Sequence, residues 1–286
     1  MSVLRKPIQT VTGIQTTDGA GVKLVRVIGN RNVYDFDPFL MLDAFDSKDP
    51  KDYVKGFPWH PHRGIETVTY LINGDIKHND SLGNEGRILD GCCQWMTAGS
   101  GIMHQEMPQP TDRMLGVQLW LNLPAKHKMT VPKYHDIEKK DVPHIQRDGY
   151  EVRIISGSFD GIKAQKNDEY VSADFLDVNL SKNTSFEIET DPDNTLFIYI
   201  VEGNGYFAKD NNVLYQSKRA ILFGSGKTFH VKADEDGMRF FLFCAKPLKE
   251  PIAWGGPIVM NTKEELQKAF DDLSQGKFID NININY

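Results

Sequence analysis

The chain of 286 residues carries 33 Lys and Arg against 39 Asp and Glu, a net charge of −6, and 40% of its residues are hydrophobic. This acidic balance matches nucleic-acid phosphates poorly, so we expect no direct nucleic-acid partner. No window approaches the roughly 20 apolar residues that a membrane span needs, and the first residues contain no apolar signal core. With only three cysteines there is no disulfide framework. Composition therefore predicts a cytoplasmic protein without a membrane partner, or a nuclear one if the source is eukaryotic.

Short runs of β-branched and aromatic residues recur along the chain between Gly, Asn, Asp and Pro. They span residues 22–29, 66–74, 93–101, 115–124, 151–159, 173–180, 195–205, 219–226 and 238–246. Strands at this spacing, without helical periods between them, predict an all-β chain of antiparallel barrels or sandwiches. Cys92 and Cys93 lie in one of the apolar stretches, and we interpret them as small buried side chains without a redox role.

A weak internal repeat indicates two similar domains. "YLINGDIKH", from Tyr70, resembles "YIVEGNGYF", from Tyr199, and "MTAGSGIMH", ending at His104, resembles "LFGSGKTFH", ending at His230. The pattern suggests one hairpin and return strand built twice. We therefore expect one domain over residues 1–130 and a second over 131–286. The polar, proline-containing segment 129–149 is interpreted as the connector.

The last part of the chain changes to a helical pattern. Thr262 is a candidate N-cap and Glu265 follows three residues later, which is the spacing of a capping box. Apolar residues at 266, 269, 270 and 273 then recur at helical spacing, and Gly276 is a stop signal. The sequence predicts one short amphipathic helix at the end of the second domain.

Two doublets of potential metal ligands stand out. His60 and His62 flank Pro61, and His104 and Glu106 lie about forty residues later with the same spacing. Residues i and i+2 of a strand point to the same face, while Pro61 faces away and suits a strand start or edge. Two such pairs on facing strands would bring three nitrogens and one carboxylate oxygen to one centre. This set predicts a metal site with open coordination positions.

Spacing alone leaves alternatives open at this site. A single His-x-His pair is more often structural than a metal site, and only the second doublet reverses that preference. Glu66, four residues after His62, would share its face if the strand ran on without a bend, so it competes with Glu106 as the oxygen ligand. The remaining histidines lack such a doublet, and we interpret them as surface or hydrogen-bonding residues: His78, His127, His135, His144 and His230.

Several long strings resemble the pirin family of the cupin superfamily. They are "HPHRGIETVTYLINGDIKHNDSLGNEG", "QWMTAGSGIMHQEMP", "GVQLWLNLP", "PKY" and "GPIVMNTKEELQKA". The resemblance implies a bicupin, two antiparallel β-barrel (jelly-roll) domains with one metal in the N-terminal domain. It departs at Gly91-Cys92-Cys93, where pirins often have Gly-Asp-Leu, a position that touches no expected ligand.

The pirin resemblance also implies the ligands, the metal and an activity. The ligands would be His60, His62, His104 and Glu106, with Glu106 favoured over Glu66. The metal would be Fe(II), one per chain, although mixed nitrogen and oxygen ligands also accept other divalent metals. The implied activity is that of a quercetin 2,3-dioxygenase, with O2 and a flavonol-like small molecule as substrates.

Within this expected mechanism, Glu106 is the catalytic base for the substrate hydroxyl. Arg63 and Gln118 are candidates to support the ligands, and Arg63 suits a surface position equally well. The alternative function is a non-enzymatic, iron-dependent redox sensor that acts as cofactor of a transcription regulator through a protein partner. In the second domain, the positions that correspond to His60 and His62 hold Glu189 and Asp191, so we expect that domain to bind no metal.

Overall fold

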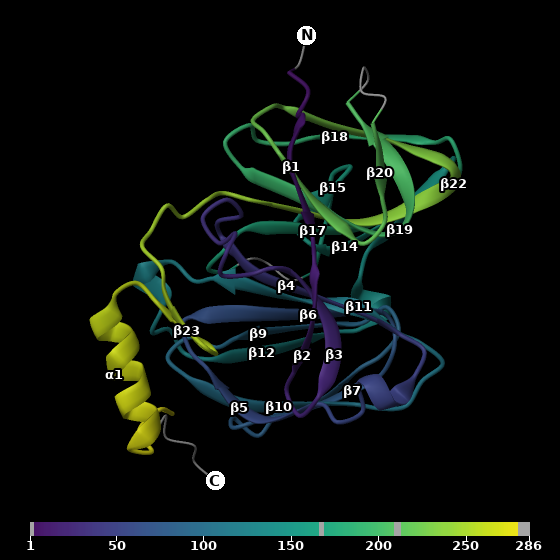
Figure 1. Cartoon of the computed structure of the whole chain (residues 1–286). Helices are drawn as coiled ribbons and strands as arrows, with labels where there is room; N and C mark the ends of the chain where they lie inside the picture. Colours follow the sequence, from purple (N-terminus) through teal and green to yellow (C-terminus); the bar gives the residue numbers. More distant parts are fainter. Residues whose placement is uncertain (1–2, 166–168, 209–212, 280–286) are drawn as a thin grey trace. The chain divides into compact units, whose positions relative to one another are not determined.

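The computed structural model describes residues 3–165, 169–208 and 213–279, and strands make up most of them (Figure 1). The contacts group the chain into two compact units, each assembled from separate pieces. Unit 1 comprises Met1–Gly13, Asn32–Pro38 and Lys140–Pro247; unit 2 comprises Ile14–Arg31, Phe39–Lys139 and Leu248–Tyr286. The predicted all-β fold with a short C-terminal helix is confirmed. The last segment, which the sequence assigned to the second domain, groups with the histidine doublets in unit 2.

Unit 2 is built on an antiparallel sheet of seven strands in the order β12-β9-β6-β11-β4-β3-β2. The strands are β2 (Ile14–Asp18), β3 (Val22–Ile28), β4 (Phe39–Ser47), β6 (Ile65–Asn73), β9 (Cys93–Thr97), β11 (Met114–Asn122) and β12 (Lys133–Ile137). The central strands β6, β9 and β11 are buried over nearly their whole length. These strands also carry buried polar side chains, among them Glu66, Thr69 and Gln118.

A second sheet of unit 2 has four strands in the order β5-β10-β7-β8. These are β5 (Phe57–His62), β7 (Ile76–Asp80), β8 (Glu85–Ile88) and β10 (Ile102–Pro108). In Figure 1, β5 and β10 lie below β6, β9 and β12, so the two sheets form facing layers. Strand β10 alternates between buried and partly exposed residues, as expected of a strand with one face toward the interior. Pro61 lies on the edge strand β5, as its missing N–H predicted.

Part of the expected connector belongs to the first of these sheets. Lys133–Ile137 forms β12, which pairs with β9 from Lys133 opposite Thr97 to Ile137 opposite Cys93. The interpretation of 129–149 as a connector is therefore wrong for these residues. A polar edge strand is hard to recognise from the sequence, because its exposed residues carry little of the apolar alternation that marks a strand.

The C-terminal segment of unit 2 adds a hairpin and the predicted helix. The hairpin consists of β23 (Ala253–Gly255) and β24 (Ile258–Met260), and the helix is α1 (Lys263–Ser274). Thr262 caps α1 and forms the full capping box with Glu265, which confirms the predicted start. Ile258, Ala269 and Phe278 form a small core between the hairpin and the helix.

Unit 1 contains an antiparallel sheet of nine strands, seven of which follow the order β1-β21-β19-β22-β17-β14-β13. Its strands are β1 (Pro7–Thr12), β13 (His144–Arg147), β14 (Tyr150–Ser156), β17 (Ala173–Leu180), β18 (Ser185–Glu189), β19 (Thr195–Phe207), β20 (Leu214–Gln216), β21 (Arg219–Phe223) and β22 (Thr228–Ala245). Phe207, Phe229 and Phe240 pack against one another in its apolar core. The smaller elements of the chain are β15 (Ser158–Phe159), β16 (Ile162–Lys163) and the short 3-10 helices η1 (Pro50–Asp52), η2 (Ala125–His127) and η3 (Lys139–Asp141).

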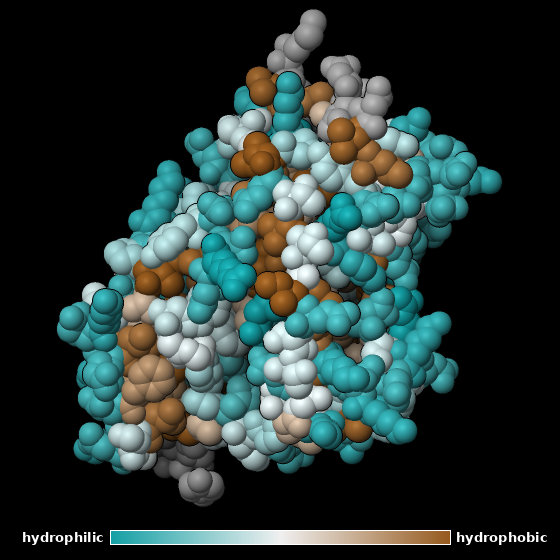
Figure 2. Space-filling model, viewed as in Figure 1, coloured by the Kyte–Doolittle hydropathy of each residue, from teal (hydrophilic) through white to brown (hydrophobic). Residues whose placement is uncertain are grey.

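Hydrophilic residues cover most of the face that Figure 2 shows, and the hydrophobic residues lie in several separate groups. Isolated exposed apolar side chains such as Val3 and Ile14 are normal on a folded protein. Among the described residues, no helix has the length and apolar character that crossing a membrane requires.

Candidate metal centre

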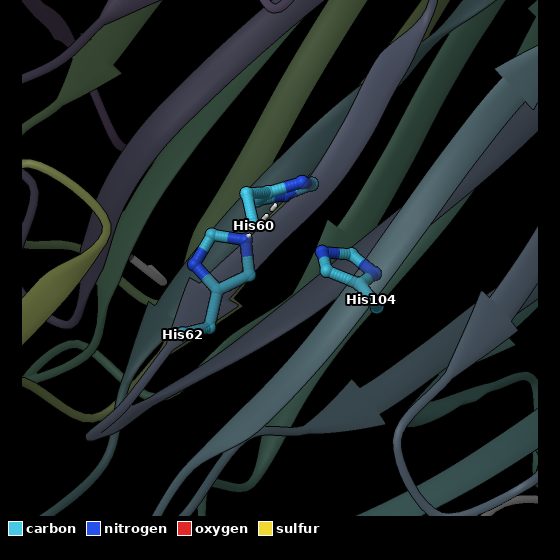
Figure 3. Close-up of side chains that lie close together, drawn as sticks. All are labelled: His60, His62 and His104. Carbon is cyan, nitrogen blue, oxygen red and sulfur yellow. Dashed lines mark hydrogen bonds between the residues drawn. The ribbon is translucent and has the colours of Figure 1, made fainter. Parts of the chain in front are cut away.

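Three histidines from two neighbouring strands of unit 2 converge on one point. His60 and His62 project from β5 and His104 from β10, and one ring nitrogen of each lies within 4.8 Å of the others (Figure 3). The strand register explains this arrangement, because His104 is directly opposite His60 in the β5–β10 pair. His62 shares the face of His60 through the two-residue period of the strand. The predicted convergence of these three residues is confirmed.

Hydrogen bonds to carbonyl oxygens fix the tautomers of two of these histidines. His60 Nδ1 lies 2.9 Å from the carbonyl oxygen of Pro58, and His62 Nδ1 lies 3.1 Å from that of Pro257. A carbonyl oxygen only accepts, so both Nδ1 atoms carry the proton and donate. Each neutral ring then has its lone pair on Nε2, and the two Nε2 atoms are 3.1 Å apart. Two lone pairs at this distance repel each other, whereas a cation between them would attract both.

Burial keeps the imidazoles of His62 and His104 in the neutral, metal-binding form. His104 is 0% exposed and His62 is 2% exposed. Burial lowers the pKa of His62 to about 3, with a smaller contribution from His60. It also lowers the pKa of His104 well below its usual value. Both ring nitrogens of His104 lack a hydrogen-bond partner among the described residues, so the donor set fits a metal ion that accepts a lone pair there.

The predicted oxygen ligand, Glu106, is held by side chains of the opposite sheet. Gln118 on β11 donates its Nε2–H groups to both carboxylate oxygens, at 3.0 and 2.8 Å, and the Thr69 hydroxyl donates to Oε1 at 3.2 Å. Glu106 is 3% exposed. The carboxylate is thus a buried, oriented hydrogen-bond acceptor next to His104 on the same strand. It lies outside the group of three nitrogens within 4.8 Å.

Glu66 has a different environment. It lies on β6, in the seven-stranded sheet, and accepts a hydrogen bond from the Thr97 hydroxyl at 2.6 Å. The strand β5 ends at His62, and Gly64 adopts a positive φ of 78° before β6 begins. This turn breaks the strand continuity on which a shared face of His62 and Glu66 would depend.

Residues after the histidine doublet anchor the C-terminal segment to the site. The Arg63 guanidinium donates to the carbonyl oxygens of Ser100 (2.5 Å) and Phe278 (2.8 Å) and forms an ion pair with Asp272 on α1 at 2.8 Å. Arg63 is 3% exposed, so its interpretation as a surface residue is wrong. Beside it, the Trp120 ring meets His62 edge-on at 4.9 Å between centroids. The Trp120 contact and the hydrogen bond to Pro257 orient the His62 ring.

Lys128 forms a second anchor for the C-terminal segment. Its buried ammonium donates to Gly64 O at 2.8 Å, Asn122 Oδ1 at 2.5 Å and Val259 O at 2.9 Å. Burial lowers its pKa to about 7, against opposing contributions from Glu250 and Glu265. Three acceptors around one buried amine join the β5–β6 turn, β11 and β24.

The sequence interpretation missed His78. It was taken for a surface or hydrogen-bonding residue, but it is 1% exposed and its ring lies 5.3 Å from that of His104. The signal was present in "HND", because His78 and Asp80 form a third doublet with the i, i+2 spacing.

In the described part of unit 1 there is no comparable histidine cluster. Among the described residues, the group of three possible ligands is the one in unit 2. Glu189 and Asp191 are exposed, and the unit 1 interior is filled by apolar side chains such as Phe186 and Phe207.

Comparison with known proteins agrees with this architecture. Residues 21–121 match the family model "Pirin", and residues 175–279 match "Pirin C-terminal cupin domain". A pirin-like protein of Caulobacter vibrioides is 43% identical over 278 residues, covering 96% of this chain and 99% of that protein. Pirin of Rattus norvegicus is 35% identical, covering 97% and 94%.

A solved structure extends the comparison to the fold. The crystal structure of quercetin 2,3-dioxygenase from Acinetobacter baumannii aligns with a TM-score of 0.88 at 32% identity and covers 96% of this chain and 98% of that one. The matches include residues of both units, and all three histidines lie within the range 21–121 that matches the first family model. The chain therefore belongs to the pirin family and has its two cupin domains.

Proposed function

We propose that this protein is a metal-dependent dioxygenase of the quercetin 2,3-dioxygenase type, with Fe(II) held by His60, His62, His104 and Glu106. The observation that carries the proposal is the pair of Nε2 lone pairs of His60 and His62 facing each other at 3.1 Å. The neutral, unpartnered His104 ring beside them adds a third nitrogen. Three neutral imidazoles and a carboxylate suit a divalent ion that keeps open positions.

When bound, the metal would supply a Lewis acid that binds an oxygen of the substrate and supports its reaction with O2. Glu106 serves as the base for the substrate hydroxyl, since its carboxylate is buried beside the ligand cluster. Gln118 donates to both of its oxygens and so holds the carboxylate in the interior. Thr69 donates to Oε1, and this pair of donors keeps the base oriented without neutralising it.

Access to the site is through the side of β5. His60 is partly exposed, and the neighbouring Trp59 is 50% exposed, whereas His62, His104 and Glu106 are buried. A flat aromatic substrate would reach the ligand cluster past His60, because Trp59, like Pro61, points to the opposite face of β5. Its reacting oxygen would then lie in a water-poor interior, where Glu106 and the metal act most strongly.

The relatives support the substrate class. The Acinetobacter baumannii protein with the same fold and 32% identity is described as quercetin 2,3-dioxygenase. A flavonol carries a hydroxyl next to a carbonyl, so it presents the acidic oxygen that Glu106 would deprotonate. We therefore propose flavonols, or related enediol-type aromatics, as substrates together with O2.

Metal content and oxygen uptake test this proposal. Purified protein should contain one metal ion per chain, and His60→Ala with His104→Ala should remove it while the fold remains, because unit 2 has its own apolar core. A flavonol added without oxygen should change the optical spectrum of the Fe(II) protein. Oxygen should then be consumed over many turnovers in the unchanged protein and in His230→Ala, but not in His104→Ala. Two metal ions per chain, or flavonol binding without turnover, would contradict the proposed dioxygenase function.

The second candidate is an iron-dependent sensor that binds a protein partner. It is favoured by the contacts that run from the ligand cluster to the surface. His62 bonds to the Pro257 carbonyl, and the adjacent Arg63 pairs with Asp272 on helix α1. A change in the metal's charge would act on residues that hold an exposed helix. A partner affinity that differs between Fe(II) and Fe(III) protein, with no turnover of any flavonol, would establish the sensor instead.

A further inference from the structure

A third inward-facing doublet lies beside the proposed ligands. His78 and Asp80 belong to β7, which pairs with β10 so that His78 is opposite Glu106 and Asp80 is opposite His104. Directly opposed residues in an antiparallel pair have Cβ atoms roughly 4.5–5.5 Å apart. The metal-binding doublet of β10 therefore has a second polar doublet as its neighbour, on the side away from β5.

The His78 ring is held in place by its neighbours but has no hydrogen-bond partner. It stacks on Tyr134 of β12 with 4.7 Å between ring centroids and an interplanar angle of 24°, and lies 5.3 Å from His104. Neither ring nitrogen has a hydrogen-bond partner among the described residues, although the ring is buried. A buried polar group without a partner costs about 1–3 kcal/mol. A molecule that supplies the partner would recover this cost.

The neighbouring polar groups are already committed elsewhere. Asp80 accepts from the backbone N–H groups of Leu82 and Asn84 and from the Asn84 amide, all within 3.0 Å. Its nearest carboxylate oxygen is 3.6 Å from His78 Nε2, which is too long for a hydrogen bond. The Tyr134 hydroxyl donates to Asp136 at 2.5 Å. His78 therefore has an electrostatic contact with Asp80, and in the described part of the chain no hydrogen bond within the usual distance occupies either of its ring nitrogens.

The ring of Tyr134 cannot move closer to supply that partner. Its hydroxyl lies over Gly86 of β8, where an added Cβ would be 2.1 Å from the hydroxyl oxygen. The absence of a side chain at Gly86 lets Tyr134 lie flat against His78. Tyr134 covers one face of the His78 ring, and the neighbours on the side of β10 are Glu106 and His104.

We propose that His78 forms a hydrogen bond with the second of two neighbouring oxygens on the substrate. This inference rests on the proposed function and narrows its substrate class to catechols, enediols and α-hydroxyketones. The first oxygen binds at the histidine cluster, where Glu106 takes the proton of its hydroxyl group. The two oxygens of such a compound are close together, and Glu106 and His78 are directly opposed on neighbouring strands, so one small ligand could contact both side chains. His78 is thus a residue that determines specificity, and it adds to binding without being a metal ligand.

Two optical probes test this role without turnover. Titrate 4-nitrocatechol, with two neighbouring oxygens, and 4-nitrophenol, with one, into the Fe(II) protein without oxygen. Compare the wild type with His78→Phe, which keeps an aromatic ring against Tyr134 but removes the nitrogens, and with His78→Gln, which restores a hydrogen-bonding group. His144→Phe places the same substitution at a histidine of unit 1 that pairs with Glu151 and serves as the control. Metal content and thermal midpoints of all four proteins verify the fold.

We expect His78→Phe to weaken 4-nitrocatechol binding about five-fold, the effect of one neutral hydrogen bond, and to leave 4-nitrophenol unchanged. His78→Gln should recover part of the loss, and His144→Phe should behave as the wild type. If His78→Phe prefers the catechol as strongly as the wild type does, or if it binds both probes more weakly by the same factor, the proposed role is wrong. If His78→Phe does not fold, the same comparison in His78→Leu, which also removes the ring nitrogens, decides. A wild-type protein that binds neither probe would overturn the proposed function as well, which separates the two failures.

Discussion

The Nδ1–H of His62 donates to the carbonyl oxygen of Pro257 across 3.1 Å, although 195 positions separate the two residues in the chain. The contact sets which nitrogen of His62 presents its lone pair to the ligand cluster. Groups that orient a metal-binding histidine in this way typically change metal affinity 10–100-fold when they are lost. The C-terminal segment thus contributes to the proposed metal centre, and its attachment should be measurable as metal retention.

Removing the ion pair that holds this segment should speed metal loss. Asp272→Ala takes away the α1 partner of Arg63, whose guanidinium also lowers the pKa of the Asp272 carboxyl. We expect metal release to a chelator to become about two- to ten-fold faster. This effect is smaller than that of losing a group that bonds directly to a metal-binding histidine, because Asp272 acts through Arg63. Asp271→Ala is the control, because that carboxylate bonds to Gln267 of the same helix. Equal release rates in the two variants would contradict a link between α1 and the site.

The two carboxylates near the cluster should respond differently to neutralisation. Glu106→Gln should weaken metal binding and abolish activity, because it removes the carboxylate that is the proposed ligand and base. It also changes the group that accepts hydrogen bonds from Gln118 and Thr69. Glu66→Gln should leave metal content nearly intact and disturb only its bond to Thr97. Elemental analysis after dialysis compares them. The opposite ranking would move the oxygen ligand to Glu66.

Lys128 should make stability depend on pH above neutrality. Its pKa is about 7 in the folded protein and near its usual value of 10.5 when unfolded. Between these values the unfolded chain binds more protons, so the free energy of unfolding should rise with pH, by at most about 4 kcal/mol. The cost of burying the charge is complete below pH 7 and is relieved as the pH rises.

Lys128→Met should flatten this rise, and denaturant unfolding of metal-free protein at pH 7 and pH 9.5 measures it. The exposed Lys126 on η2 supplies the control Lys126→Met, which should keep the wild-type slope. If the slopes of Lys128→Met and wild type coincide, the ammonium is stabilised by its three oxygen acceptors and remains charged in the folded protein.

A methyl group at Gly86 should displace Tyr134. The Cβ of Gly86→Ala would lie 2.1 Å from the Tyr134 hydroxyl oxygen and 2.8 Å from an Asp136 oxygen, so both side chains must move. We expect a loss of about 1–3 kcal/mol in unfolding free energy, as for other overpacked sites. Gly29→Ala, whose Cβ would meet Arg26 at an ordinary 3.4 Å, is the control. Thermal melting of both variants provides the comparison.

The predictable part of this site follows from strand geometry. The doublets of His60 with His62 and of His104 with Glu106 were recognisable because a strand returns to the same face every second residue. The start of α1 was recognisable because Thr262 and Glu265 satisfy each other's backbone groups. In both cases the structure depends on residues close together in the sequence.

The unpredicted part depends on groups that leave no residue-specific signal. The oxygen that orients His62 is a backbone carbonyl, which any residue at position 257 could provide. The stacking of Tyr134 on His78 required knowing that a polar segment forms an edge strand of the sheet. Arg63 could be assigned to the surface or the interior, and its burial depends on Asp272 and Phe278 far along the chain.

The contact between His62 and Pro257 also bears on how the protein is made. A ribosome adding 5–20 residues per second needs roughly 10–40 s to travel from one residue to the other. During that interval the first histidine doublet exists without the carbonyl that later selects its tautomer, and Arg63 has no helix to bind. A nascent chain therefore carries an unfinished site through most of its synthesis. The metal centre becomes complete only when the final segment has left the ribosome and folded back, so a truncated product would possess all the proposed ligands and still lack the orientation of His62.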